Sequence, residues 1–282
     1  MSASSETLEL REVRGPSALG GGTRRFWELL WLMSLTEFKR AYFGTVLGYF
    51  WSLLRPLMLF AVLLFVFTRI FRLGSAVENY PVLLLFNVVV FGFFQESTVS
   101  AVTSVVAQEG IVRKTQFPRL VIPLSIVLTG LMNLGLNLIA VFAFILAYGV
   151  APMWTWLLLP VILLPLTMLT TAISMLLSAL YVRFRDVLII WTVAATVLFY
   201  GTPLLYPIEV APEGLRAPMM VNPLAVIFEQ ARVWIIDPNA PTAAEAAGSV
   251  WRLIPALVIF VGVCMLGWRV FTREAPRIAE AL

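Results

Sequence analysis

Glu96 is the residue of this sequence best placed to do chemistry, because it interrupts an apolar run that extends from Pro81 to Ala107. Ser100, Thr103 and Ala107 follow it at helical spacing, so one face of a helix would carry a carboxylate and two hydroxyls. Ionisable groups in membrane helices usually face a cavity or a partner. The pattern therefore indicates a polar path, and a structural carboxylate near the outer half of the bilayer explains it about equally well.

Other kinds of chemistry are poorly represented in the chain. It has no histidine, which is the commonest general base and metal ligand, and its one cysteine, Cys264, lies in an apolar run. There is no Gly-rich phosphate loop that ends in Lys-Ser or Lys-Thr. Paired intramembrane carboxylates and a Ser/His/Asp set are also missing. We therefore expect no enzyme active site, no metal site and no cofactor in this chain.

The elements that position Glu96 are set by hydropathy. Of the 282 residues, 60% are hydrophobic and 13% are charged, and the mean hydropathy is +0.92. The apolar residues form runs of about 20, the length that crosses a hydrocarbon core. The chain is predicted to be an all-α, polytopic membrane protein with six transmembrane helices. Their expected ranges are 46–71, 81–107, 120–148, 154–180, 187–205 and 253–271.

Charge predicts the orientation of these helices. With both termini in the cytosol, fifteen of the 20 lysines and arginines lie on the inner side, as the positive-inside rule requires. We expect a multi-pass protein of a bacterial plasma (inner) membrane, with flexible cytosolic tails at 1–23 and 273–282 and the membrane domain at 44–272. The first 23 residues do not have the pattern of a signal peptide. No basic stripe outside the membrane-flanking segments suggests nucleic acid.

Two further segments have helical patterns without the length of a span. Within 24–43 the residues Trp27, Leu30, Trp31, Leu35, Phe38 and Tyr42 recur every three or four positions, which predicts an amphipathic helix at the inner interface. Between spans five and six, an apolar pattern at helical spacing follows Asn222, a suitable helix cap, and Pro223, a suitable first helical residue. This segment is predicted to form short re-entrant or interfacial helices.

Five stretches together resemble a known family. They are GTVLGYFWSLLRP (44–56), IVRKTQFPRLVIP (111–123), YVRFRDV (181–187), FYGTPLLYPIEVAP (199–212) and VNPLAVIFEQARVWIID (221–237). In this order they resemble the permease subunits of ABC exporters for lipid-linked polysaccharides, the branch that serves O-antigens, capsules, teichoic acids and galactan. The similarity extends from about Arg24 to Phe271.

The resemblance implies a subunit that pairs with a second copy of itself and with two separate ABC ATPase subunits, which bind ATP and Mg. The pair would form a channel that carries the polysaccharide from the cytosolic side to the outer side. The translocation path would include Tyr49 and Trp51 together with Glu96, Ser100 and Thr103. Residues implied to couple to the ATPase are Glu37, Phe38, Lys39, Arg40, Arg113, Lys114, Phe117, Pro118 and Arg119. An inner-end charged turn would comprise Arg183, Arg185 and Asp186, and an outer gate Pro203, Tyr206, Pro207, Asn222 and Pro223.

Two alternatives remain open from the sequence. A related ABC exporter for a drug, an antibiotic or a lipid would share the fold and the ATPase partners and would differ only in cargo. A membrane-embedded acyl- or glycosyl-transferring enzyme would need a cluster of titratable side chains that faces one leaflet, whereas Glu96 stands almost alone in the predicted spans.

Overall fold

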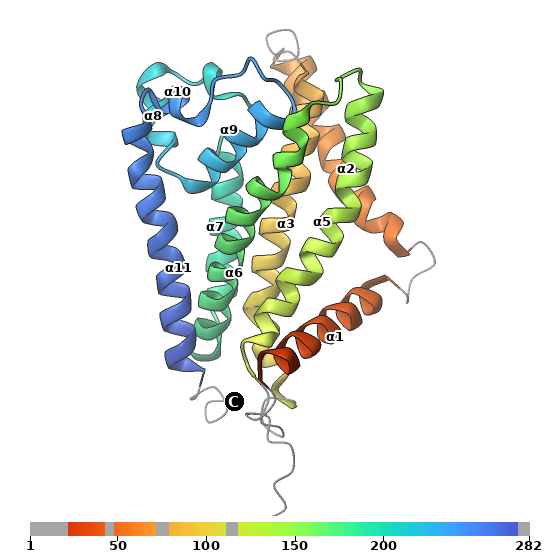
Figure 1. Cartoon of the computed structure of the whole chain (residues 1–282), viewed down its shortest axis with the longest axis vertical. Coiled ribbons are helices and arrows are strands. Elements are labelled where there is room, and N and C mark those ends of the chain that lie inside the picture. Colours follow the sequence, from red (N-terminus) through yellow and green to blue (C-terminus); the bar gives the residue numbers. More distant parts are fainter. Residues whose placement is uncertain (1–21, 43–47, 72–78, 111–117, 276–282) are drawn as a thin grey trace, which may run out of the picture.

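Each apolar run of the sequence forms a helix. The structure, a computed structural model, describes residues 22–42, 48–71, 79–110 and 118–275, and these contain helices and no strand. The membrane helices are α2 (Gly48–Phe65), α3 (Tyr80–Ala107), α5 (Val121–Ala147), α6 (Leu159–Arg183), α7 (Val187–Gly201) and α11 (Ile254–Glu274). Three of them are extended by a short turn: α2 continues as the π-helical turn η1 (Val66–Ile70), and the 3₁₀ turns η3 (Trp154–Leu158) and η5 (Val250–Leu253) precede α6 and α11. They form one bundle (Figure 1).

Among the described residues, five of these helices are long and apolar enough to cross a membrane, and α7 is a shorter apolar helix of 15 residues. The all-α prediction is therefore confirmed, and the helix count agrees with six. The predicted end of span five at Leu205 is wrong, because α7 ends at Gly201. Pro203 explains the early end, since a proline disfavours helical backbone at the residue before it and has no N–H for a helical hydrogen bond.

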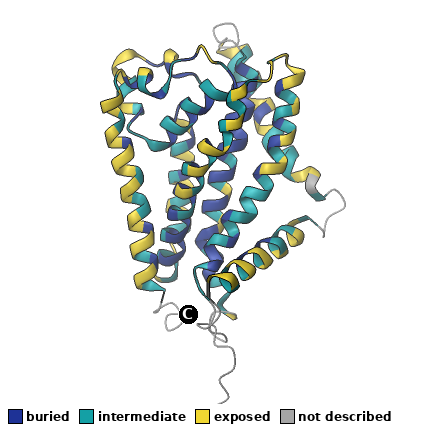
Figure 2. Cartoon of the chain, in the orientation of Figure 1, coloured by how far each residue is buried: buried dark blue, intermediate teal, exposed yellow. Residues whose placement is uncertain are grey.

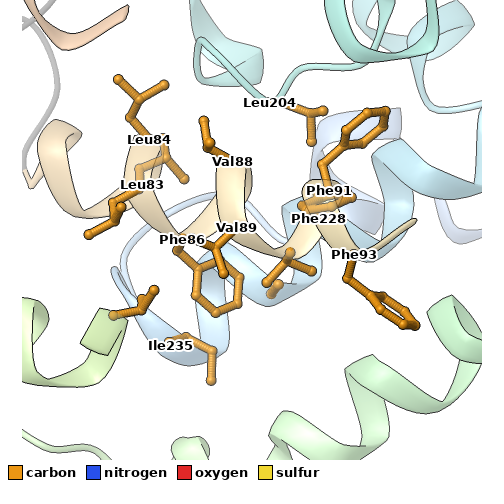
Figure 3. Packing of buried hydrophobic residues seen from close by; sticks show 14 of the residues in the cluster. Leu83, Leu84, Phe86, Val88, Val89, Phe91, Phe93, Leu204, Phe228 and Ile235 are labelled. Atoms are coloured by element: carbon orange, nitrogen blue, oxygen red, sulfur yellow. The ribbon is translucent and has the colours of Figure 1, made fainter. Parts of the chain in front are cut away.

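Helix α3 is the centre of the bundle. In its most apolar stretch 78% of the residues are buried, against 11% in α2 and 11% in α11, whose outer faces are exposed (Figure 2). Its side chains, among them Phe86 and Phe91, pack against residues from the far end of the chain such as Phe228 and Ile235 (Figure 3). A helix that is apolar all round is expected to be buried. The element that carries Glu96 is thus held on several sides.

Helices α6 and α11 approach each other to backbone contact. A Cβ added at Gly267 of α11 would lie 2.2 Å from the carbonyl oxygen of Ala172 of α6. Small residues allow membrane helices to pack this closely. The last apolar helix is thereby fixed to the bundle at a point where any larger side chain would clash.

The chain between α7 and α11 folds into short helices at the end of the bundle opposite α1 (Figure 1). They are η4 (Ile208–Val210), α8 (Glu213–Met219), α9 (Pro223–Ile235) and α10 (Ala243–Ala247). The predicted cap is confirmed, because the Asn222 side chain accepts a hydrogen bond from the Leu224 N–H and Pro223 occupies the first turn of α9. Helix α9 is partly inserted, since Phe228 and Ile235 reach the core around α3.

Helix α1 (Gly22–Tyr42) confirms the predicted N-terminal helix, and its apolar residues point in two directions. Leu30 and Ser34 are buried, and the Ser34 carbonyl oxygen accepts a hydrogen bond from the Thr129 hydroxyl of α5 at 3.1 Å. Trp27 and Trp31 remain 64% and 56% exposed. One stripe of α1 therefore packs on the bundle, and a second is left for an apolar or interfacial environment.

Candidate functional site

A cavity of about 400 Å³ opens between α1, α2, α3 and α5, and Phe199 of α7 also contributes to its wall. We call it the polar recess, because many of its lining side chains are polar although most of the helices that form it are apolar. The polar lining residues are Glu37, Ser52, Arg55, Gln95, Glu96, Ser97, Ser100, Thr129, Asn133 and Asn137. Phe91, Phe93 and several aliphatic residues complete the wall.

Arg55 and Glu96 form an ion pair at the recess. The guanidinium Nη1 of Arg55, on α2, donates to Oε1 of Glu96, on α3, at 3.0 Å, and the two side chains are 80% and 58% exposed. The expectation that Glu96 is almost alone in the membrane is therefore wrong. Arg55, one of the fifteen basic residues predicted for the inner side, lies within α2. Glu96 also lies nearer the α1 end of α3 than the outer half, because it shares the recess with Glu37 of α1.

Two buried polar atoms of the recess have no hydrogen-bond partner among the described residues. They are the hydroxyl oxygen of Ser97 and the side-chain oxygen Oδ1 of Asn133. Gly130 makes room for the first of them, since a Cβ at that position would lie 2.2 Å from the Ser97 oxygen. Buried polar atoms without partners are rare in folded proteins and call for an explanation such as a ligand or water.

The predicted path residues are only partly brought together. Glu96 and Ser100 line the recess. Thr103 is half-buried, Trp51 is 55% exposed, and neither contributes to the wall. Tyr49 belongs to α2, but its side chain lies outside the described part of the chain.

The predicted coupling residues that the structure describes lie at the α1 end of the bundle. Glu37 lines the recess, Phe38 makes an edge contact with the Tyr42 ring, and Lys39 and Arg40 are exposed. Pro118 and Arg119 are half-buried, and their carbonyls accept the first backbone hydrogen bonds of α5. The remaining predicted residues, Arg113, Lys114 and Phe117, are outside the described residues.

The charged turn connects α6 to α7 and touches the last helix. Arg183 lies 3.7 Å from the carboxylate of Glu274 at the end of α11. The Arg185 guanidinium lies 5.0 Å from the centre of the Tyr181 ring, and Asp186 is exposed immediately before α7. These contacts fit a turn that holds the ends of three helices together.

Three of the predicted gate residues, Pro203, Tyr206 and Pro207, lie in the segment 202–207, which hydrogen bonds from α3 hold in place. The Tyr80 hydroxyl donates to the Leu205 carbonyl at 2.7 Å, and the Asn87 amide donates to the Leu204 carbonyl at 2.9 Å. The Asn222 amide donates to the Thr202 hydroxyl at 2.8 Å, which ties the start of α9 to the same segment. Of the predicted gate residues themselves, Pro203 and Pro207 are buried and Tyr206 and Pro223 are half-buried.

Sequence reasoning missed a second charged cluster at this end. Nη1 of the buried Arg232 donates to Oε2 of Glu209 at 2.7 Å and to Oε1 of the buried Glu229 at 3.0 Å. Burial raises the pKa of Glu229 to about 7 against the opposing attraction of Arg232. Burial alone would also raise the pKa of Glu209, but the hydrogen bond and charge of Arg232 outweigh it and lower that pKa. The spacing of Glu229 and Arg232 in α9 was the available signal.

A bundle of apolar helices with a polar recess towards one end and a hydrogen-bonded segment at the other is the architecture of a multi-pass membrane protein. The chain belongs to the ABC-2 type transporter family, whose sequence model matches residues 28–236. It is a non-catalytic transport subunit that works with separate ABC ATPase subunits.

Three relatives illustrate the similarity. Two are O-antigen export system permease proteins RfbA of Klebsiella pneumoniae, one 30% identical over 259 residues (91% of this chain and 95% of the relative) and one 31% identical over 200 residues (71% and 76%). The third is an O-antigen export system permease protein RfbA of Myxococcus xanthus, 30% identical over 230 residues (79% and 88%).

Proposed function

We propose that this chain is the permease subunit of an exporter that moves a lipid-linked polysaccharide of the O-antigen type from the cytosolic side of the membrane to the outer side. The relatives named as O-antigen export permeases support this choice of cargo over a drug or an antibiotic. The ATP and Mg would be bound by the partner ATPase subunits, and this chain would supply the passage.

The exposed ion pair between Arg55 and Glu96 is the observation that carries the proposal. Charged side chains within membrane helices are costly in contact with lipid and face a bundle interior or a water-filled space. The surface on which the recess opens is therefore suited to a hydrated passage. A hydroxylated polymer needs such a passage, because each hydroxyl without a partner in hydrocarbon costs on the order of several kcal/mol.

A second copy of the chain would close this passage. One bundle leaves the recess open on one side, and two bundles that face each other would enclose a wider space between their charged pairs. The lipid anchor could remain in the bilayer while the glycan passes. In this arrangement α1 and the segment 111–119 would contact the ATPase, and both termini would be cytosolic. The arrangement of the helices supports this orientation, since α1 and the last turns of α11 lie at the same end of the bundle (Figure 1).

Deletion of the gene in its own host tests the cargo. We expect the surface polysaccharide to be lost and a lipid-linked glycan to accumulate on the cytosolic leaflet, and a plasmid copy should restore export. If the deletion leaves the surface polysaccharide unchanged and traps no glycan, the proposed cargo is wrong.

Replacing Arg113 and Lys114 together by alanine tests the coupling surface. We expect normal insertion with weaker co-purification of the ATPase, because two positive charges of the proposed docking segment would be lost. Arg252→Ala is the matched control, since it removes a charge from the opposite end of the bundle. Unchanged ATPase binding in the double variant would remove this segment from the interface.

A further inference from the structure

The polar recess has the chemistry of a binding site for uncharged, hydroxyl-rich ligands. A volume of about 400 Å³ lies at the lower end of the range for small-molecule sites. We propose that the recess is a subsite that holds one or two neutral sugar units of the glycan by hydrogen bonds to Ser97 and Asn133. This inference rests on the proposed function and specifies which part of the cargo this chain recognises.

The hydrogen-bonding groups of the wall have spare capacity for such a ligand. Ser97 is 3% exposed, and its hydroxyl lacks a partner among the described residues, as does Oδ1 of Asn133 on the facing helix α5. A sugar hydroxyl both donates and accepts, so it can satisfy the Asn133 oxygen and the Ser97 hydroxyl in turn. The Ser97 hydroxyl packs directly against Gly130 of α5, where a Cβ would lie 2.2 Å from its oxygen, so it occupies the α5 side of the recess.

The charges of the wall favour a neutral ligand over an anionic one. Arg55 is the cation among the described residues of the wall, and its guanidinium is engaged by Glu96 at 3.0 Å. Glu37 adds a second carboxylate. A phosphate or an acidic sugar would meet an excess of negative charge, whereas carboxylates accept readily from neutral hydroxyls.

The aromatic part of the wall suits the apolar faces of a sugar ring. Phe91, Phe93 and Phe199 all line the recess, and the faces of a pyranose carry C–H groups that can lie on their rings. Polar groups on α3 and α5 and rings on α3 and α7 would then contact different faces of one ligand.

The test uses the complete permease–ATPase complex in nanodiscs without nucleotide. Binding of a neutral hexose tetrasaccharide and of its phosphorylated counterpart is measured by saturation-transfer NMR for the wild type and for Ser97→Ala and Asn133→Leu. Ser104→Ala is the matched control, because Ser104 is also buried on α3 and its hydroxyl already donates to the Ala101 carbonyl at 2.7 Å.

We expect the neutral tetrasaccharide to bind and each recess variant to weaken it by about tenfold, the effect of one well-placed hydrogen bond. The melting temperature of both variants should be equal to or higher than that of the wild type, because each removes a buried polar atom without a partner. Ser104→Ala should bind normally. A merely structural role of Ser97 and Asn133 would lower the melting temperature and leave binding in the milder Ser97→Ala variant intact.

Unchanged binding in Ser97→Ala and Asn133→Leu would overturn the subsite, and so would tighter binding of the phosphorylated sugar. These results are distinguishable from failure of the proposed function. If gene deletion abolishes polysaccharide export while both variants bind sugar normally, the proposed cargo is supported and only the proposed subsite is wrong. If deletion leaves export intact, the cargo itself is wrong.

Discussion

Arg55 and Glu96 are 41 positions apart in the chain and meet at 3.0 Å at the recess, where α2 and α3 diverge. Because both side chains are more than half exposed, the pair contributes little to folding stability, on the order of 0–1 kcal/mol. Its cost in contact with lipid is much larger. The ion pair is therefore better explained by the polar recess that it lines than by its contribution to folding stability.

Replacing Arg55 by leucine should separate transport from stability. We expect the melting temperature of the purified protein to change little, because an exposed ion pair is lost, and polysaccharide export to fall. The double variant Arg55→Glu/Glu96→Arg should recover part of the export, since it restores opposite charges at the same two positions. A reversed pair that exports no better than Arg55→Leu would mean that the sign of each charge matters on its own.

Gly267→Ala should destabilise the protein by about 1–3 kcal/mol, the usual cost of overpacking. The added methyl group would lie 2.2 Å from the Ala172 carbonyl oxygen, and backbone atoms on both sides resist displacement. Gly262→Ala on the same helix is the control, because a Cβ there has no atom within 4 Å. Thermal unfolding in detergent measures both. Equal melting temperatures for the two variants would contradict the close contact of α6 and α11.

Glu229 should make stability depend on pH. Its pKa of about 7 in the folded protein exceeds the ordinary value of 4.5, so the folded state binds this proton more tightly than the unfolded chain does. The resulting stabilisation is complete below about pH 4.5 and is lost as the pH rises through about 7. Glu229→Gln, which cannot ionise, should lose less melting temperature than the wild type between about pH 5 and pH 8. The exposed Glu213→Gln should follow the wild type.

Asn222 has two roles, as the cap of α9 and as the donor to Thr202, and two substitutions can separate these roles. Asn222→Ala removes both the cap of α9 and the bond to Thr202, and should cost about 0.5–2 kcal/mol for the cap alone. Asn222→Asp keeps an oxygen for the Leu224 N–H but cannot donate to Thr202. We therefore expect Asn222→Asp to unfold near the wild-type temperature. Cross-linking between introduced cysteines in 202–206 and α9, in a Cys264→Ala background, should then report a looser outer segment.

The positions of the long helices could be predicted from the sequence because they depend on local hydropathy. Span two was expected at 81–107 and α3 occupies Tyr80–Ala107. The start of α9 was equally local, since one asparagine cap and one proline define it. The end of α7 was predicted too late because apolar residues continue past Pro203, and hydropathy does not detect where backbone hydrogen bonding stops.

The partners within the site could not be predicted in the same way. Glu96 was recognised as unusual, but nothing in its neighbourhood points to Arg55 on another helix. Ser97 and Asn133 are ordinary polar residues in their own helices, and they become notable only because the packing of α3 on α5 leaves their oxygens without partners. The third member of the outer cluster, Glu209, lies 23 positions from Arg232, beyond the reach of any helical repeat.

Helix α1 has consequences beyond its place at the edge of the bundle. Ser34 fastens it to α5, and one turn later Glu37 forms part of the recess wall. A tilt of a helix attached in this way would move Glu37 together with the rest of α1. A partner that displaces the exposed face of α1 would therefore narrow or widen the polar recess directly. Nucleotide hydrolysis in that partner and the volume open to the cargo would then be linked through this one helix.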